Sequence, residues 1–314
     1  MRVLLLVNPY SSSVTARTRV VIRKALAGDH EVELVETARR GHATRLAQGA
    51  AVEGVDVVVA LGGDGTVNEA ANGLAGTATA LAVLPGGSTN VFARTIGLPN
   101  DPVESTAIVL EALEASSIHR IGLGSVNGRY FCFHVGMGYD AALVEQVEKR
   151  SGLKRWAGHP LFMWAGIATW FKYYDTKHPH FRVSYLDGDH VDDGYFTVCC
   201  NTNPYTYIGN RPFDIAPEAT LDNGLAVVTV RSLRIDRILR VVLRAVQGGG
   251  ALARDPAVHY RYDVADLVVE GLDRRPFPYQ VDGDHLGEIE RLELRHVPDI
   301  LDLVLPVGTS AVAG

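Results

Sequence analysis

An apolar segment that runs straight into a cluster of glycines constrains the fold of this chain more than any other feature. Residues 55–61 read VDVVVAL, and they are followed at once by GGDGT and by the helix-like stretch VNEAANGLA. A short segment that is apolar at nearly every position is typical of a parallel strand buried on both faces. Glycine tolerates positive φ angles and the close approach of a second backbone. The pattern therefore predicts a buried strand, a tight turn and a helix.

The neighbouring segments repeat this alternation. RVLLLV and EVELVE have the character of strands, whereas residues 14–27 and 42–54 have helical spacing. After the glycines we predict a helix over about 67–74, a strand TALAVLP and a short helix VFARTIG that ends before Pro99. The order βαβαβ, with continuous apolar strands, predicts a Rossmann-like α/β domain with a parallel sheet.

The pattern changes near residue 120, where short segments such as RYFCFHV, FRVSYL, YFTVCC and LAVVTVRS are separated by Gly, Asp and Asn. Alternating segments of this length are typical of antiparallel strands. We therefore predict two domains. Residues 1–119 form the α/β domain, which the C-terminal tail 298–314 rejoins, and residues 120–297 form a β-rich antiparallel sandwich.

Composition limits the partners and the location. The 314 residues carry a formal net charge of −6, which disfavours nucleic acid as a partner. The three cysteines, Cys132, Cys199 and Cys200, lack the spacing of a zinc site and indicate a reducing environment. No apolar run approaches the roughly 18 residues of a membrane-spanning helix. We therefore predict a cytoplasmic protein, at most peripheral at the inner face of the membrane.

Two glycine-rich turns indicate where a ligand binds. In open α/β sheets, ligands lie where the carboxyl ends of the strands lead into helices, and GGDGT (62–66) and PGGSTN (85–90) occupy such places. The glycines are expected to take positive φ and to expose N–H groups to a phosphate at the positive end of the next helix, which Thr66 caps. Asp64 would repel a phosphate unless it reached a Mg²⁺ ion that the phosphates also bind. Either turn alone is better explained as an ordinary strand-to-helix connection, but the two together on successive strands favour a nucleotide.

Other nucleotide fingerprints are missing or incomplete. No G-x-x-x-x-G-K-[ST] segment occurs, which excludes a P-loop NTPase. Residues 136–141, GMGYDA, match G-x-G-x-x-A, but no second strand with a ribose-binding acid follows. We therefore predict that this segment forms a turn in the β-rich domain.

The ordered set GGDGTVNE, LPGGSTNVFARTIGLP and VDGD resembles the diacylglycerol kinase catalytic family, particularly its soluble bacterial lipid kinases. The first motif is shared with NAD kinases and 6-phosphofructokinases, whereas the three in this order are more selective. The opening NPYSS is similar to the family's N-P-x-S-G, and Thr37 matches a family threonine. The resemblance implies an ATP-dependent kinase that uses Mg²⁺ and phosphorylates a lipid hydroxyl, diacylglycerol-like or sphingoid-like. It also implies ATP contacts by Asn8, Pro9, Ser11, Ser12, Thr37, Gly62, Gly63, Asp64, Gly65, Thr66, Asn68, Glu69, Gly86, Gly87, Ser88, Thr89 and Asn90.

The catalytic base is implied by the third motif. The family uses D-G-E, and the segment VDGD has Asp284 at the glutamate position, one methylene shorter. Asp282 lies two residues earlier, on the same side of the chain if the segment is extended. We predict Asp284, Asp282 and Asp64 as catalytic residues and expect ATP and Mg²⁺ between the two domains. From the residues alone, a hairpin turn is the better explanation of Asp282 and Gly283, and such a turn can also present a carboxylate.

Two family features are altered. Family members hold a structural Mg²⁺ through aspartates at positions that are Gly122 and Asn223 here. Loss of two carboxylates removes most of the affinity for a hard cation, so the resemblance predicts no structural Mg²⁺ site, although Asp222 is adjacent.

All three tryptophans fall within residues 154–178, whose helical spacing and flanking lysines and arginines are compatible with an amphipathic element at a membrane surface. A helix packed on the sheet explains the same pattern. Two alternatives to a lipid kinase remain: an NAD kinase-like enzyme, and a nucleotide- or lipid-binding protein impaired in catalysis. A homodimer also remains open.

Overall fold

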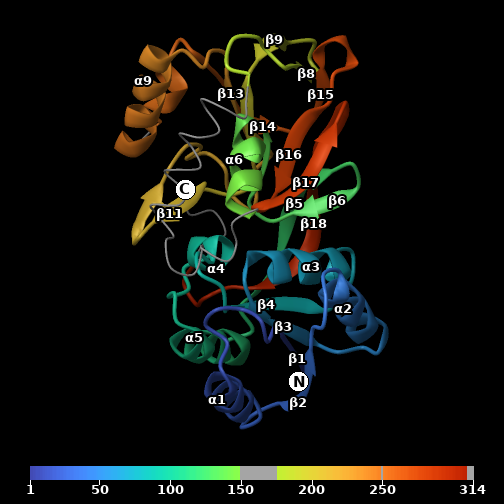
Figure 1. Cartoon of the computed structure of the whole chain (residues 1–314). Coiled ribbons are helices and arrows are strands. Elements are labelled where there is room, and N and C mark those ends of the chain that lie inside the picture. Colours follow the sequence, from blue (N-terminus) through green and yellow to red (C-terminus); the bar gives the residue numbers. More distant parts are fainter. Residues whose placement is uncertain (149–174, 249, 310–314) are drawn as a thin grey trace. The chain divides into compact units, whose positions relative to one another are not determined.

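The computed structural model describes residues 1–148, 175–248 and 250–309 (Figure 1). The chain divides into two compact units. The N-terminal unit contains residues 1–123, 220–222 and 297–313, and the sandwich unit contains residues 124–219 and 223–296. In the part of the chain that the structure describes, no helix is long and apolar enough to cross a membrane.

The N-terminal unit is built on a parallel sheet in the order β2-β1-β3-β4. Its elements are β1 (Arg2–Val7), α1 (Ala16–Leu26), β2 (Glu31–Glu36), α2 (His42–Val52), β3 (Val57–Gly62), α3 (Asp64–Leu74), β4 (Ala80–Pro85), α4 (Val91–Thr95) and α5 (Pro102–Glu114). Strands β3 and β4 are buried along their whole length, because helices cover both faces of the sheet. Figure 1 shows α2 and α3 on one face and α1 and α5 on the other. The predicted parallel α/β fold is confirmed.

The sandwich unit is antiparallel, as predicted. One sheet has the order β14-β13-β10-β7-β16-β17, and the other pairs β15 with β8 and with the first half of β18. Strands β5 (Ile118–Val126) and β18 (Arg291–Val304) each have residues in both units. The other elements of the sandwich unit are β6 (Arg129–Phe131), β7 (His134–Gly138), α6 (Tyr139–Glu148), β8 (Phe181–Tyr185), β9 (His190–Gly194), β10 (Phe196–Cys200), β11 (Thr206–Ile208), β12 (Arg211–Phe213), β13 (Leu225–Val230), α9 (Ile235–Gln247), β14 (Val258–Val264), β15 (Asp266–Gly271), β16 (Phe277–Val281) and β17 (Asp284–Ile289). Buried side chains from both sheets, such as Met137, Phe277 and Val269, form one apolar core between them.

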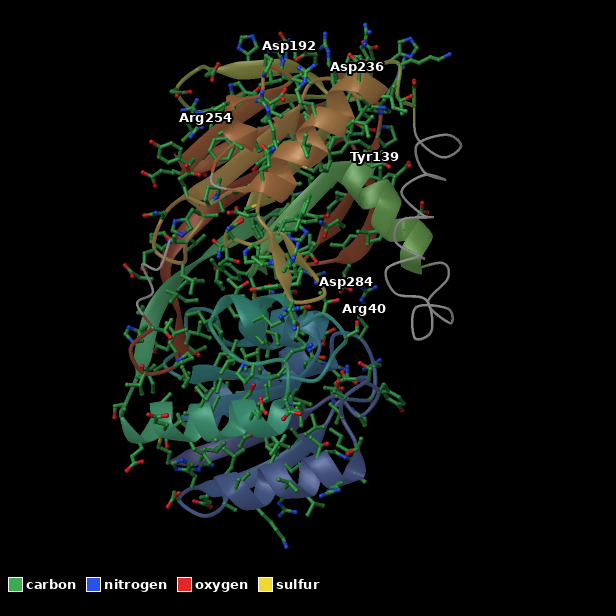
Figure 2. All side chains as sticks on the ribbon, turned by 90° about the vertical axis from the view of Figure 1, so that its left-hand side faces the viewer. Arg40, Tyr139, Asp192, Asp236, Arg254 and Asp284 are labelled. Atoms are coloured by element: carbon green, nitrogen blue, oxygen red, sulfur yellow. The ribbon has the colours of Figure 1, made fainter. Side chains whose placement is uncertain are left out.

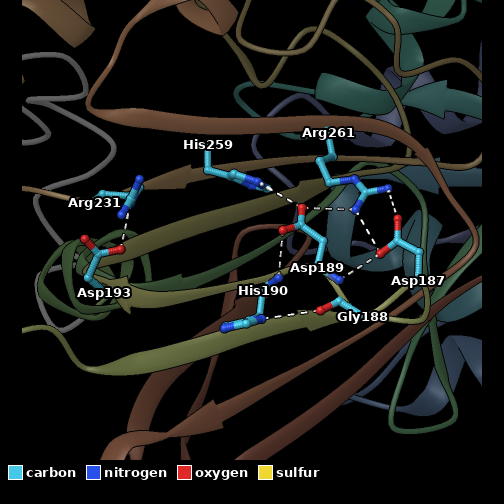
Figure 3. Close-up of polar contacts among 8 residues, drawn as sticks. All are labelled: Asp187, Gly188, Asp189, His190, Asp193, Arg231, His259 and Arg261. Atoms are coloured by element: carbon cyan, nitrogen blue, oxygen red, sulfur yellow. Dashed lines mark hydrogen bonds and ion pairs between the residues drawn. The ribbon is translucent and has the colours of Figure 1, made fainter.

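A polar network connects the β8–β9 hairpin to β14 across the outside of the sandwich (Figure 3). The Arg261 guanidinium donates to both carboxylate oxygens of Asp187, at 2.7 and 3.1 Å, and to Asp189 at 3.2 Å. Arg261 also lies over the ring of Tyr185, 4.5 Å from its centroid. His259 Nε2 lies 3.3 Å from Asp189. A bidentate pair supported by an aromatic face fixes the position of the hairpin more firmly than a single exposed ion pair would.

Three local predictions were wrong. RYFCFHV forms two strands, β6 and β7, because the backbone N–H groups of Cys132 and Phe133 turn toward the carboxylate of Asp282. The segment GMGYDA is not a turn, since it ends β7 and begins α6 at Tyr139 (Figure 2). Helix α3 begins at Asp64, so Thr66 lies inside it and does not cap it. The membrane-surface prediction for residues 154–178 falls almost entirely outside the described residues.

Candidate active site

Three loops meet at the carboxyl ends of β1, β3 and β4 in the N-terminal unit. The carbonyl of Gly62, at the end of β3, accepts the N–H of Gly86, which follows β4, at 2.7 Å. The carbonyl of Gly86 accepts the N–H of Ser13 from the loop after β1 at 2.8 Å. Asn8 Nδ2 donates to Thr66 Oγ1 at 3.0 Å. The predicted glycine-rich turns therefore lie together at one edge of the sheet and are hydrogen-bonded to one another.

The glycines are needed for this close approach. A Cβ atom on Gly86 would lie 2.8 Å from Gly62 Cα, and one on Gly87 would lie 2.8 Å from Gly63 Cα. A Cβ on Gly62 would lie 2.6 Å from the Thr66 side chain. None of these glycines has a positive φ angle. The predicted reason for them, positive φ, was wrong: the absence of a side chain lets the two backbones touch. Gly62 and Gly86 are buried in this contact, and Gly63, Gly65 and Gly87 leave partly exposed backbone beside it.

Asn90 is the residue in this region with a strained backbone. Its φ is 50° and its side chain is buried, with only 3% of the residue exposed. Its Oδ1 accepts the N–H of Gly87 at 2.8 Å, and its Nδ2 donates to the carbonyl of Gly87 at 2.9 Å and to Asn100 Oδ1 at 2.6 Å. Asparagine tolerates this left-handed conformation better than most residues. Asn90 thus closes the second loop on itself.

Asp64 connects the two loops. Its carboxylate accepts the backbone N–H groups of Val91, at 3.0 Å, and Phe92, at 3.1 Å, which are the first two residues of α4. These N–H groups have no partner within the helix, so Asp64 caps α4 from a distance in sequence. The residue is half-buried rather than solvent-facing. Its contact with a metal ion stays a prediction.

The remaining predicted ATP contacts occupy different environments. Glu69 accepts the N–H groups of Gly41 and Ala43 at 2.7 and 3.1 Å, so its carboxylate caps α2. Thr37 is buried after β2 and donates its N–H to the carbonyl of Val7 at 2.8 Å. Among the others, Asn68 is buried, Ser12 and Ser88 are exposed, and Pro9, Ser11, Gly65 and Thr89 are partly exposed. Their nucleotide contacts stay predictions.

In the sandwich unit, Asp282 and Gly283 form the turn between β16 and β17, as the hairpin interpretation predicts. Both have positive φ, 48° and 79°, and Val281 pairs with Asp284 across the turn. This is the geometry of a two-residue hairpin loop. Asp282 is 3% exposed, and its carboxylate accepts the N–H groups of Cys132, Phe133 and His134 at 2.7 to 3.1 Å.

The two carboxylates of VDGD therefore have different environments. They do not lie on one side of an extended segment, as expected, because the turn reverses the chain between them. Asp282 is buried and fixes the β6–β7 corner, whereas Asp284 is half-buried at the start of β17 (Figure 2). Of the two, Asp284 has the exposure that a proton acceptor for an incoming substrate requires.

His134 is a residue of this region that the sequence did not single out. It is 5% exposed and lies between the rings of Phe133 and Tyr205, with centroids 4.8 and 4.5 Å away. Burial lowers its pKa from 6.5 to about 3, so the imidazole is neutral. Its backbone N–H donates to Asp282. Nothing in the alternating segment RYFCFHV distinguishes it from a surface histidine.

Comparison with known proteins agrees with this architecture. Residues 2–126 match the diacylglycerol kinase catalytic domain, and residues 134–305 match the YegS C-terminal NAD kinase beta sandwich-like domain. The chain is 37% identical over 120 residues to a diacylglycerol kinase of Bacillus subtilis, a match that spans 38% of this chain and 39% of that one. It is 30% identical over 225 residues to a protein of Chromohalobacter salexigens named "Probable lipid kinase YegS-like", spanning 70% and 68% of the two chains.

The fold also agrees with a solved structure. A diacylglycerol kinase from Bacillus anthracis superposes with a TM-score of 0.70 at 19% identity, over 98% of both chains. The parallel sheet with its joined loops and the sandwich together define a protein of the kinase class. The chain belongs to the diacylglycerol kinase catalytic family, and within it to the YegS-like lipid kinases.

Proposed function

We propose that this protein is an ATP-dependent lipid kinase that transfers the γ-phosphoryl group of ATP to a hydroxyl of a lipid, diacylglycerol-like or sphingoid-like. The observation that carries the proposal is the contact between the Gly62 and Gly86 loops at the carboxyl ends of β3 and β4. A surface of bare backbone beside the N-terminus of α3 suits the phosphates of a nucleotide, because N–H groups and the positive end of the helix favour an anion.

The residues of this surface fit a magnesium nucleotide. Asp64 is half-buried, is held in place by α4, and supplies the carboxylate oxygen that Mg²⁺ prefers. The ion, when bound, would neutralise the charge of the phosphates. Main-chain groups of the Gly63 and Gly87 segments would hold the phosphates in place. The side chains of Asn8 and Asn90 orient these segments rather than reach outward.

Asp284 takes the role of the base in this proposal. Phosphoryl transfer needs little covalent chemistry from the protein beyond positioning, charge neutralisation and acceptance of a proton. The Asp284 carboxylate would accept the proton of the lipid hydroxyl. The hydroxyl oxygen would at the same time bond to the γ-phosphorus, and the bond between that phosphorus and ADP would break. Asp282 acts as a positioning residue, because its oxygens already accept three backbone N–H groups.

A transfer assay tests the proposal. The purified protein is incubated with γ-labelled ATP and Mg²⁺, and the acceptors are diacylglycerol in vesicles, a sphingoid base in vesicles, or NAD. We expect label in a lipid. Label in NAD alone would replace the proposal by the NAD kinase-like alternative, and absence of transfer to every acceptor, with ATP binding intact, would favour a binding protein impaired in catalysis.

Two substitutions assign the roles. Asp284→Asn is expected to lower turnover by about 10²- to 10⁴-fold, the usual effect of removing a general base. Asp64→Asn should raise the Mg²⁺ concentration needed for half-maximal activity. Asp29→Asn, at an exposed position, is the matched control and should change neither quantity. Normal turnover of Asp284→Asn would show that this carboxylate is not the base.

A further inference from the structure

Helix α9 (Ile235–Gln247), labelled in Figure 1, belongs to the sandwich unit. It uses only part of its apolar surface to pack against the protein. Val241 and Ala245 are 6% and 3% exposed, and Ile238 packs beside them on an apolar core that includes Val198 and Val228. These three helical residues lie on one side of the helix, because residues three or four apart share a face.

A second apolar stripe of α9 faces solvent. Ile235, Leu239 and Leu243 are spaced by four residues and are 59%, 65% and 57% exposed. Each residue turns the helix by about 100°, so this stripe lies beside the packed face and not on it. Elsewhere in the described chain, large exposed apolar residues such as Leu186 and Val52 do not form a helical row of three. A row of this kind indicates an interaction surface.

Arg240 borders the stripe. At about 100° per residue it lies about 60° around the helix from Leu243, whereas Arg237 lies on the side away from the stripe. Both arginines are exposed, and neither makes an ion pair with a described residue. Arg234 pairs with Asp236 at the start of the helix, and Arg244 pairs with a buried aspartate at its end. The segment 234–244 thus holds four arginines and one aspartate in a chain whose net charge is −6. The helix that carries the exposed apolar row is therefore positively charged.

We propose that α9 is a docking surface for an anionic lipid bilayer, with Ile235, Leu239 and Leu243 inserted at the level of the headgroups and Arg240 in contact with lipid phosphates. An apolar row bordered by a long basic side chain suits this interface, because the arginine stem lies along the apolar region while its head reaches the phosphates. The proposed function explains why such a surface would be useful, because it would bring the enzyme to a lipid acceptor, and the proposal rests on it in this respect alone. Binding itself needs no phosphotransfer.

The occupant follows from the charge. A second copy of this chain would place Arg240 of one α9 near Arg240 of the other if the two stripes met face to face in antiparallel orientation, which is unfavourable. An anionic bilayer offers phosphate to Arg240 and attracts the other arginines of the segment. Each basic residue near such a surface strengthens binding by roughly fivefold, and the effect falls off within a Debye length.

Vesicle sedimentation without ATP tests the proposal. Vesicles contain phosphatidylcholine alone or a mixture with phosphatidylglycerol, and the full chain is used. We expect binding to the anionic vesicles that weakens as salt rises. Leu239→Ser with Leu243→Ser should weaken it by about tenfold or more, since the inserted side chains lose their apolar burial. Arg240→Glu should weaken binding to anionic vesicles by more than about fivefold, because a charge is reversed.

Matched controls are present in the same chain. Leu186→Ser removes an exposed leucine outside the row, and Arg17→Glu reverses an exposed arginine in α1; both should bind like the parent protein. Melting temperatures identify any variant that fails to fold, in which case the single Arg240→Glu decides. Equal vesicle binding by the α9 variants and the parent would overturn the proposal. A molecular mass that rises with protein concentration, and no longer does so in the leucine variants, would also overturn it, because a second copy of the chain would then cover the stripe.

A parallel assay on a short-chain, water-soluble lipid separates this proposal from the proposed function. Loss of vesicle binding with normal turnover on the soluble acceptor is the expected behaviour of the α9 variants. If the parent binds vesicles but phosphorylates no lipid, the kinase proposal fails and the docking surface stands. If the parent phosphorylates lipid but does not bind anionic vesicles, the docking surface fails alone.

Discussion

The two glycine-rich loops of the N-terminal unit can touch because their glycines have no side chain. At Gly86 the neighbouring atoms are the Cα and N of Gly62, at 2.8 and 2.9 Å from the position of a Cβ. Backbone atoms cannot move aside as a flexible side chain can, so even a methyl group must separate the loops. The contact between the two loops therefore depends on the missing side chain of Gly86 and not on the conformational freedom of glycine.

Gly86→Ala is therefore expected to destabilise the protein by about 1–3 kcal/mol, the usual cost of forcing extra volume into a packed site. Gly49→Ala is the matched control, because a Cβ there meets no atom within 4 Å and the residue lies inside α2. That substitution should stabilise by roughly 0.5–1 kcal/mol through helix propensity. Urea unfolding measures both. A Gly86→Ala protein as stable as the parent would show that the loops can part without cost.

His134 makes the stability depend on pH. Its pKa is about 3 in the folded protein, because burial disfavours the charged ring, whereas an unfolded histidine has a pKa near 6.5. The unfolded chain therefore binds the proton more readily between these two values. The contribution of the neutral ring is fully present above about pH 6.5 and is lost progressively as the pH falls toward 3.

Between pH 6.5 and pH 5 the titration of His134 should lower the free energy of unfolding by about 2 kcal/mol, which is about 1.36 kcal/mol for each of 1.5 pH units. His134→Gln removes the titration, so its unfolding free energy should change less between pH 7 and pH 5 than that of the parent. The measurement is urea unfolding at both pH values. Identical pH dependence in the two proteins would mean that His134 is protonated without cost, which contradicts its burial.

At the scale of an element, the β16–β17 hairpin carries one buried and one half-buried carboxylate. Asp282 accepts three backbone N–H groups, from Cys132, Phe133 and His134. It thereby fixes the corner between β6 and β7. Asp284 is two residues away and half-buried. The same short turn thus positions a strand junction of the sandwich and exposes a carboxylate.

The two aspartates should respond differently to the same substitution. Asp282→Asn should cost about 2–4 kcal/mol of stability, since an amide nitrogen would face donors and leave buried N–H groups unpaired. Asp284→Asn should lower turnover and leave the unfolding free energy within about 0.5 kcal/mol of the parent. Turnover and urea unfolding are measured on both variants. A stable Asp282→Asn protein, or an unstable Asp284→Asn protein, would reverse the assignment.

At the scale of the whole molecule, the segments around Gly122 and Asn223, where the sequence predicts no structural Mg²⁺, make hydrogen bonds within the protein. Gly122 donates its N–H to the carbonyl of Leu221 at 3.1 Å, and Gly224 donates to Asp263 Oδ1 at 3.0 Å. Asp222 and Asn223 lie in a turn that precedes β13. Within the described ranges, no three His, Cys, Asp or Glu side chains are arranged to hold a metal ion.

We therefore predict that the melting temperature of the protein without nucleotide is the same in EDTA and in millimolar Mg²⁺. An ion at one hundred times its dissociation constant would stabilise the folded state by about 2.7 kcal/mol, which a melting curve detects readily. Asp222→Ala and Asn223→Ala serve as the check. If Mg²⁺ stabilises the parent and not these variants, a structural ion is bound with altered ligands.

The sequence by itself determined the class of each half of the molecule. Continuous apolar strands such as RVLLLV predict a sheet buried on both faces, and the alternating segments after residue 120 predict antiparallel strands, because both follow from the side-chain period of a strand. It also placed the glycine-rich loops at one edge of the sheet, since parallel strands end on the same side. The Asp282–Gly283 turn was likewise readable from two residues.

Only the tertiary structure decided what those residues contact. Asp64 caps α4, 27 residues away, Glu69 caps α2, and Asp282 binds N–H groups about 150 residues earlier in the chain. The sequence around an aspartate or glutamate can look the same whether its carboxylate binds a metal ion, a proton or a backbone N–H group. The difference arises from which donors the fold brings within about 3 Å. Contacts between distant segments carry no local signal, and for that reason the roles of these carboxylates required the structure.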